Sequence, residues 1–291
     1  MKTPIFIILI LLLLTACTRP FQRGLAGART GSIEGQITSG GVSRHYLLHV
    51  PAGYRAGVPV PLVLNFHGSG SNSNQEQALT GMSAKADREG FIVVYPDGIN
   101  AEWATGPKAD GQRDRQFVRD LVASLESQYS IDPERIYATG ISNGGGMVDR
   151  LGCALAGVIA AIAPDSGAYN FWQDCHPSRP VPVLAFHGLD DQIVPYLGGT
   201  PEFLLPPIPD WAAAWAGRDG CAPTPVETSP AAGVSVRTWS GCRGNAEVIL
   251  YTLANHGHSW PGSTAMPAAI TSMAVNATDV MWEFFRSHPM P

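Results

Sequence analysis

A serine, a carboxylate and a histidine occur in three short motifs whose side chains could together attack an acyl group. Ser142 lies in GISNG, Asp190 and Asp191 lie in HGLDDQIVPY, and His256 and His258 lie in NHGHSWPG. A serine hydroxyl is a poor nucleophile at neutral pH, so it needs an imidazole base within hydrogen-bond reach and an acid that orients this base. We expect Ser142 to be the nucleophile, His258 the base and Asp191 the acid.

Rivals lie close to the expected base and acid. His256 lies two positions before His258, and an HxH pair can also hold a metal ion, but no third ligand is apparent nearby in the sequence. We therefore expect His256 to bond within its loop, and we expect neither a metal nor another cofactor. Asp190 and Asp191 cannot both point at one imidazole, and Asp165 is a further candidate. Spacing alone leaves the choice between Asp190 and Asp191 open.

The serine motif lies where a nucleophile turn would need to lie. An apolar strand is expected over residues 135–139, and helical spacing follows over residues 142–157. Between them, Gly140 and Gly144 allow a tight turn that holds the Ser142 hydroxyl clear of the sheet. A GxSxG match on its own says little, whereas strand, turn and helix in this order support a nucleophile at Ser142.

Acyl transfer also needs donors for the negative charge that develops on the carbonyl oxygen. The serine turn offers the backbone N–H of Asn143. The segment HGSGSN, which begins at His67 after an apolar strand at residues 62–66, offers a second N–H at Ser69. We expect these two groups to form the oxyanion hole, and we expect His67 to stabilise the loop beside it.

Segments of strand length alternate with helical segments along most of the chain. The expected strands are short, apolar and bounded by glycine or proline, which is typical of a parallel sheet buried on both faces. Strands are expected at residues 62–66, 91–95, 135–139, 159–163, 181–186 and 248–253, and helices at residues 74–88, 115–129, 142–157 and 278–286. An antiparallel edge strand is expected near residues 43–50, and a helix cap at Asn276. The pattern predicts the α/β class, with a mainly parallel central sheet and helices on both faces. The order serine, acid, histidine is that of the α/β-hydrolase fold.

Size and charge narrow the function classes. The chain has 291 residues, of which 45% are hydrophobic, and this is enough for one large core. We expect a single catalytic domain over residues 32–291, and we expect a monomer. The net charge of -5 offers no basic surface for nucleic acid, so DNA and RNA are poor partners.

The first residues predict export. Lys2 precedes an apolar run over residues 5–14 that is too short to cross a bilayer, and Cys17 follows in the sequence LTAC. This pattern resembles a bacterial lipoprotein signal, which implies a signal peptide over residues 1–16 and a lipid on Cys17. Residues 17–31 would then tether the domain in the cell envelope, and the protein would meet a membrane only through its lipid. A plain secretory peptide cut nearby is the alternative.

Four further cysteines predict disulfides in an exported chain. Cys153, Cys175, Cys221 and Cys242 permit three pairings, which the sequence alone does not separate. We expect neighbours to pair, Cys153 with Cys175 and Cys221 with Cys242. Buried free thiols are the alternative.

The motifs together resemble those of the secreted serine esterases that include polyhydroxybutyrate depolymerases and feruloyl or acetyl xylan esterases. The similar segments are LVLNFHG from residue 62, VVYPDG from 93, IDPERIYATGISNGGGM from 131, FHGLDDQIVPYLGG from 186 and GHSWPG from 257. The resemblance implies a triad of Ser142, Asp191 and His258 and a small or oligomeric ester as substrate. It also implies that a disulfide between Cys221 and Cys242 would be ordinary.

Aromatic residues near the expected site predict a pocket for a phenolic or sugar ester. Trp260 lies beside the expected base, Trp103 and Tyr196 lie near strand ends, and His67 precedes the oxyanion loop. Extracellular polyester depolymerases of this kind usually carry a separate polymer-binding domain, and the last expected helix lies near the end of this sequence. We therefore expect soluble or small esters rather than crystalline polymer.

Two other functions fit the same motifs. A peptidase or thioesterase could use the same triad, because the serine turn and the base do not reveal the leaving group. A tethered binding lipoprotein could keep the fold without catalysis.

Overall fold

The computed structural model describes residues 29–105, 109–170, 175–199 and 204–291. The expected signal peptide, Cys17 and most of the expected tether lie outside the described residues.

Ten strands of the described chain form one sheet, in the order β1-β2-β4-β3-β5-β6-β7-β10-β9-β8. The strands are β1 (Gly31–Ser39), β2 (Val42–Val50), β3 (Val60–Phe66), β4 (Ile92–Pro96), β5 (Ile131–Ile141), β6 (Ala161–Asp165), β7 (Val183–Gly188), β8 (Val226–Ala231), β9 (Val234–Trp239) and β10 (Val248–Leu253). The central strands from β4 to β10 in this order pair in parallel, and the two strands at each edge pair antiparallel. Each strand expected in the centre is present, and β2 is the expected antiparallel strand near one edge.

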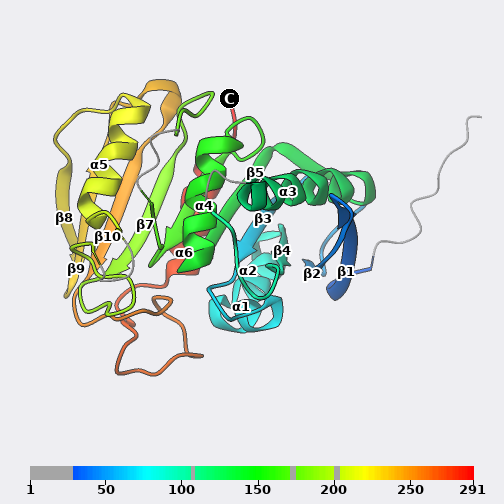
Figure 1. Cartoon of the computed structure of the whole chain (residues 1–291), viewed down its shortest axis with the longest axis horizontal. Helices are drawn as coiled ribbons and strands as arrows, with labels where there is room; N and C mark the ends of the chain where they lie inside the picture. The colour runs from blue at the N-terminus through cyan, green and yellow to red at the C-terminus, as the bar shows by residue number, and fades with distance from the viewer. Residues whose placement is uncertain (1–28, 106–108, 171–174, 200–203) are drawn as a thin grey trace, which may run out of the picture.

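Helices cover both faces of this sheet. They are α1 (Ser73–Thr80), α2 (Met82–Glu89), α3 (Ala109–Gln128), α4 (Asn143–Ala154), α5 (Ile208–Asp219) and α6 (Ala277–Ser287). One core contains buried side chains of α3, α4 and α5, and the other contains side chains of α2 and α6. Figure 1 looks onto the face with α3, α4 and α5, with α6 behind the sheet. The expected α/β class is confirmed.

Several elements differ from the expected ones, and two of the differences have an identifiable reason. The single helix expected at residues 74–88 is two helices, because Gly81 between them takes a left-handed conformation with φ 60°. The edge strand β8 was not expected, and its exposed residues include Glu227, Thr228 and Ser229, which do not form an apolar run. The expected cap of the last helix is confirmed, since the Asn276 side chain accepts from the Asp279 N–H at 3.0 Å.

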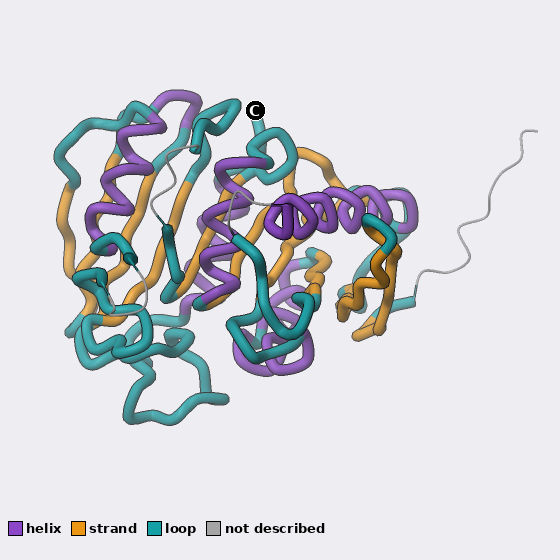
Figure 2. The backbone as a smooth tube through the Cα atoms, viewed as in Figure 1, coloured by secondary structure: helices purple, strands orange, loops and turns teal. Residues whose placement is uncertain are grey.

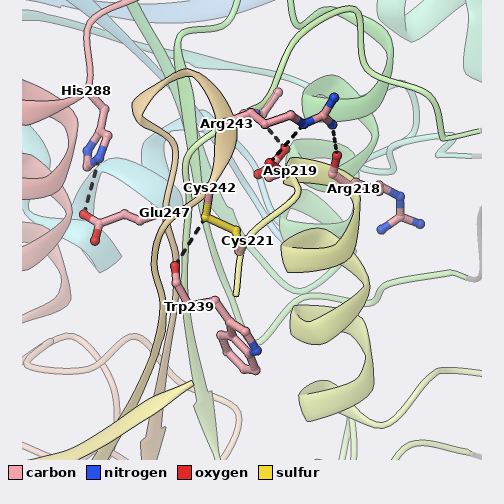
Figure 3. The surroundings of a disulfide bond; sticks show 9 residues. Arg218, Asp219, Cys221, Trp239, Cys242, Arg243, Glu247 and His288 are labelled. Carbon is pink, nitrogen blue, oxygen red and sulfur yellow. Dashed lines mark hydrogen bonds and ion pairs between the residues drawn. A yellow bond between two sulfur atoms is a disulfide. The ribbon is translucent and has the colours of Figure 1, made fainter. Parts of the chain in front are cut away.

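Both expected disulfides are present. Cys153 in α4 bonds to Cys175, and Cys221 after α5 bonds to Cys242 before β10. Figure 3 shows the second of these beside the end of α5. Disulfides of this kind persist in oxidising compartments, which agrees with an exported protein.

The strand order reverses at the place where the serine motif lies. β3 lies between β4 and β5, so the chain passes to one side of β3 and then to the other. The loop after β3 and the turn after β5 are therefore neighbours at the carboxyl ends of the parallel strands. In open α/β sheets, ligands bind at such a reversal. Loops from the segments after β7 and β10 gather at the same end of the sheet (Figure 2). No helix within the described ranges is long and apolar enough to span a membrane.

Candidate active site

Ser142 lies on a strained turn between β5 and α4. Its backbone angles are φ 57° and ψ -122°, a conformation that costs a residue with a side chain about 1–3 kcal/mol. The Ser142 N–H donates to the carbonyl of Asp165 at 3.1 Å, and the Ser142 carbonyl accepts from Gly146 and Ala168 at 2.9 and 3.0 Å. These hydrogen bonds from neighbouring segments keep the serine in its unusual conformation.

Gly140 and Gly144 let this turn lie against the end of β3. A Cβ added at Gly140 would lie 2.4 Å from the Phe66 carbonyl oxygen, and a Cβ added at Gly144 would lie 2.1 Å from it. Neither glycine has a positive φ. The GxSxG pattern is therefore required here by the close approach of two backbones rather than by a left-handed conformation.

His258 and Asp191 form a hydrogen-bonded pair at the carboxyl ends of β10 and β7. The His258 Nδ1 lies 2.8 Å from the Asp191 Oδ2. Because a carboxylate only accepts, this geometry fixes the proton on Nδ1 and leaves Nε2 as an acceptor. The His258 side chain is 19% exposed, whereas the Asp191 side chain is fully buried. The imidazole can thus meet a ligand, and the carboxylate cannot.

The other Asp191 oxygen is held by the backbone of the same loop. Oδ1 accepts from the N–H groups of Ile193 and Val194 at 2.9 and 2.8 Å. Burial acts to raise the pKa of Asp191, but the hydrogen bond and charge of His258 and the Val194 N–H outweigh it and lower the pKa. Asp191 is therefore an ionised, fixed acceptor for the imidazole.

The rivals of this pair lie in other environments. The His256 ring is fully buried, with Nε2 2.9 Å from the Ser259 carbonyl, while its Nδ1 accepts from the Ser272 N–H at 2.8 Å. Asp190 is exposed. Asp165 is fully buried and neither of its carboxyl oxygens bonds to a described group, and burial raises its pKa. Of the two neighbouring aspartates, Asp191 is the one that contacts His258. In the described part of the chain, no group of three or more potential ligands is placed to hold a metal ion.

The loop after β3 lies beside the serine turn. A Cβ added at Gly68 would lie 3.3 Å from the Ser142 Cβ. The buried His67 holds this loop, because its Nε2 accepts from the Gly98 N–H at 2.9 Å and its Nδ1–H donates to the Gly68 carbonyl at 2.7 Å. Burial lowers the pKa of His67, which keeps the ring neutral.

The Asn143 side chain links the serine turn to the segment that contains Trp103. Its side-chain oxygen accepts from the Trp103 N–H at 2.7 Å, and its side-chain nitrogen donates to the Trp103 carbonyl at 3.0 Å. Asn143 is also the first residue of α4, where backbone N–H groups have no partner within the helix. Its N–H is therefore suited to an oxyanion, and its side chain fixes the neighbouring wall.

A cavity of about 470 Å³ opens at Ser142. Its wall contains both polar and apolar side chains. Its described lining consists of Ser69, Glu102, Thr105, Ser142, Asn143, Ala168, Asn170, Ile193, Val194 and Leu205. Ser142 and the two residues expected to stabilise an oxyanion, Asn143 and Ser69, thus line one cavity.

Comparisons with known proteins agree with this arrangement. A family model described as Esterase PHB depolymerase matches residues 44–178. Feruloyl esterase C of Emericella nidulans is 31% identical over 250 residues, which cover 83% of this chain and 83% of that protein. The chain belongs to the PHB depolymerase esterase family. The expected enzyme class, a carboxylic ester hydrolase, is confirmed at the level of this family.

Two further comparisons extend over much of the esterase chain. Feruloyl esterase B of Piromyces equi is 32% identical over 232 residues, which cover 74% of this chain but 42% of that protein. The chain therefore spans less than half the length of that relative. The structure of an acetyl xylan esterase from Aspergillus awamori matches with a TM-score of 0.64 and 15% identity, covering 87% of this chain and 99% of the other. At this identity the match shows a shared fold.

The prediction that aromatic rings line the substrate pocket of this esterase is wrong. Trp260 is 1% exposed and donates from its indole to the Thr278 hydroxyl within the core. Trp103 is 3% exposed and donates to the His67 carbonyl. Tyr196 is half-buried and bonds to the Thr252 hydroxyl at 2.8 Å. Together with the buried His67, these rings support the loops of the site, and none of them is among the described residues that line the cavity.

Sequence reasoning missed Glu102, the charged residue of the described cavity lining. Its carboxylate accepts from the Ser69 hydroxyl. The preceding residues Asn100 and Ala101 both have positive φ, 55° and 59°, and the Gly70 N–H donates to the Ala101 carbonyl at 2.9 Å. Two consecutive left-handed residues without glycine give no signal in the sequence, so the turn that presents Glu102 was not predictable.

Proposed function

We propose that this esterase hydrolyses carboxylic esters with Ser142 as nucleophile, His258 as base and Asp191 as the group that orients the base. The observation that carries the proposal is the 2.8 Å hydrogen bond from His258 to the buried Asp191. It leaves Nε2 of the imidazole as an acceptor at the same end of the sheet as the strained serine turn. A serine made reactive by a neighbouring base is what this chemistry requires.

In the proposed reaction the Ser142 Oγ attacks the ester carbonyl carbon while its proton passes to Nε2 of His258. The N–H groups of Asn143 and Ser69 would stabilise the oxyanion, in a role that is typically worth about 3–4 kcal/mol for each donor. His258 then gives the proton to the departing alcohol, and an acyl group remains on Ser142. A water molecule attacks in the same way, and the acid is released.

The cavity chemistry favours neutral esters with one polar and one apolar part. Glu102, Thr105 and Asn170 offer acceptors and donors to hydroxyl groups, and Ile193 and Leu205 offer apolar surface. The similar proteins are a feruloyl esterase and an acetyl xylan esterase by name. We therefore propose that the substrates are small or oligomeric esters of a sugar with an acetyl or phenolic acid.

Labelling with a fluorophosphonate probe tests the proposal. The folded protein is expected to be labelled at Ser142, identified by peptide mass, and to turn over p-nitrophenyl esters, methyl ferulate and acetylated xylan. A folded protein that neither reacts with the probe nor cleaves any ester would overturn the proposal and favour the binding lipoprotein. Cleavage of thioesters or peptides without cleavage of oxygen esters would favour the second enzyme class with the same triad.

The lipid anchor on Cys17 is a separate part of the proposal. Its support is the sequence LTAC after the apolar run, together with disulfides that indicate an oxidising compartment. Metabolic labelling with an alkyne fatty acid in a bacterial host is expected to mark the wild type and not Cys17→Ala. Equal labelling of both would reject Cys17 as the lipidation site.

A further inference from the structure

A second cavity, of about 290 Å³, lies at the amino-terminal end of the same parallel strands. The segment that enters β7 contributes Arg179, the last turn of α5 contributes Arg218, and the 3-10 helix η1 (Arg243–Asn245) before β10 contributes Arg243. His176 also lines it. Since β7 has six residues, the strand separates this cavity from the catalytic end by about 20 Å.

The two disulfides hold the segments that carry these arginines. Cys175 itself lines the cavity and is bonded to Cys153 in α4. The bond between Cys221 and Cys242 joins the second residue after α5 to the residue before η1, which brings the segments of Arg218 and Arg243 together. In Figure 3 the Arg243 side chain reaches the end of α5 beside this disulfide. The arrangement is cross-linked rather than a chance meeting of surface side chains.

Close backbone packing fixes Arg243 further. A Cβ added at Gly220, where φ is 69°, would lie 2.8 Å from the Arg243 Nε. The Arg243 guanidinium donates to the carbonyls of Asp219 and Arg218 at 3.4 and 2.6 Å. These bonds use two of its five N–H groups and leave the others for a ligand.

Arg179 and Arg218 add positive charge that no carboxylate of the described residues contacts directly. Within the described chain, Arg179 donates to the backbone carbonyls of Ala156, Ile159, Ala160 and Pro180. These bonds use four of its five N–H groups, so Arg179 contributes mainly its charge. Arg218 lies over the ring of Trp215 at 5.3 Å. Among the described residues, none of the three arginines forms an ion pair with an acid.

Asp219 is an acid on which the charges of all three arginines act, and it is poorly placed to neutralise them. It is fully buried, its Oδ1 accepts from the Val181 N–H at 3.0 Å, and its Oδ2 has no partner. Burial raises the pKa of Asp219 to about 7 against the opposing effects of the Val181 N–H and the three arginines. Near pH 7 part of the population is therefore neutral, and Asp219 offsets at most one of the three positive charges.

We propose that this cavity is a binding site for a phosphate group, separate from the ester-hydrolysing site. Guanidinium groups bind phosphate through paired N–H donors and keep their charge at any physiological pH. Arginines from three segments line the cavity, so an anion with several charged oxygens, such as phosphate, can meet more than one guanidinium at a time. The volume accepts phosphate with a small substituent, so free phosphate and a phosphomonoester headgroup are the two sources.

Thermal unfolding and isothermal titration with inorganic phosphate test the site on the disulfide-bonded protein. Phosphate is expected to raise the Tm in a saturable way, and sodium chloride at equal ionic strength is not. The double variant Arg218→Gln/Arg243→Gln is expected to bind phosphate at least tenfold more weakly and to keep its ester hydrolysis. Arg237→Gln is the matched control, because Arg237 pairs with Glu227 on the edge strands, and its phosphate affinity should be unchanged.

Arg243→Lys is a second variant that controls for a folding defect. Lysine keeps the positive charge but lacks the paired N–H donors of the guanidinium. An intermediate affinity is expected for it. Equal phosphate binding by the wild type and the double variant, or a Tm response no larger than that of chloride, would overturn the proposal.

Cosedimentation distinguishes the two sources of phosphate. Binding to phosphatidylcholine vesicles that contain phosphatidic acid, when inorganic phosphate and the double variant both abolish it, would identify a headgroup as the ligand. Phosphate binding without vesicle binding would identify free phosphate. Vesicle binding that neither phosphate nor the double variant reduces would contradict the site.

Discussion

The two ends of the parallel strands differ in charge and in how their side chains are held. At the carboxyl end, Asp191 and Glu102 bring negative charge, and backbone hydrogen bonds and a strained serine turn position the groups. At the amino end, arginines gather and disulfides hold the segments that carry them. In this molecule a strained backbone turn positions the proposed nucleophile, whereas disulfides between segments hold the positively charged side chains in place.

Replacing the proposed nucleophile should have the largest effect. Ser142→Ala removes the attacking oxygen, so kcat for p-nitrophenyl acetate is expected to fall about 10⁴- to 10⁶-fold. The Tm should change little, because the Ser142 side chain is only half-buried and belongs to the cavity wall. Ser71→Ala in the neighbouring loop is the control. Near-normal hydrolysis by Ser142→Ala, after exclusion of contaminating enzyme, would remove the nucleophile from the scheme.

Replacing the proposed acid, Asp191, should have the second largest effect. Asp191→Asn can present an N–H to His258 and so favour the wrong tautomer, and kcat is expected to fall about 10³- to 10⁴-fold. Asp190→Asn is the matched control, because Asp190 is exposed beside Asp191, and it should stay within about twofold of wild type. The reverse ranking of the two variants would move the acid by one residue.

The catalytic end was the more predictable of the two. Motif order and the strand, turn and helix pattern predicted Ser142 and His258, since each follows an apolar strand whose position was clear. The family resemblance favoured Asp191 over Asp190. The aromatic pocket was not predictable in the same way, because Trp103 and Trp260 lie near the site in sequence while their rings point into the core. The arginine cavity had no signal at all, because Arg179, Arg218 and Arg243 come from three separate segments.

Removing one disulfide should affect the arginine cavity and leave ester hydrolysis at the other end of the strands unchanged. Cys221→Ser/Cys242→Ser opens a link between residues 21 apart, and the free energy of unfolding in urea is expected to fall by about 2–4 kcal/mol. Well below the Tm, ester hydrolysis should persist while the Tm response to phosphate is lost. A parallel loss of hydrolysis in folded protein would show that the two ends are coupled.

The Glu102 carboxylate in the wall of the cavity at Ser142 should disfavour negatively charged substrates. Glu102 is exposed at the cavity wall, so Glu102→Gln is expected to raise kcat/KM for mono-p-nitrophenyl glutarate about fivefold relative to p-nitrophenyl butyrate. Glu34→Gln on β1 is the control, because Glu34 is exposed on the strand at the far edge of the sheet. An unchanged ratio of the two kcat/KM values would show that Glu102 does not set the charge preference.

The smallest effect concerns the pH dependence of stability at the amino end. The pKa of Asp219 is raised to about 7 from its ordinary 3.8, so the folded protein keeps a proton that the unfolded chain releases. Stability contributed by this proton is present at low pH and is lost as the pH rises from about 4 to about 7. Asp219→Asn should therefore make the Tm fall less steeply across this window, although the buried Glu76 and Asp165, whose pKa values are also raised, keep part of the slope. Tm values measured from pH 4 to pH 8 for the wild type, Asp219→Asn and the control Glu34→Gln check this, and identical slopes in all three would show that Asp219 is ionised throughout.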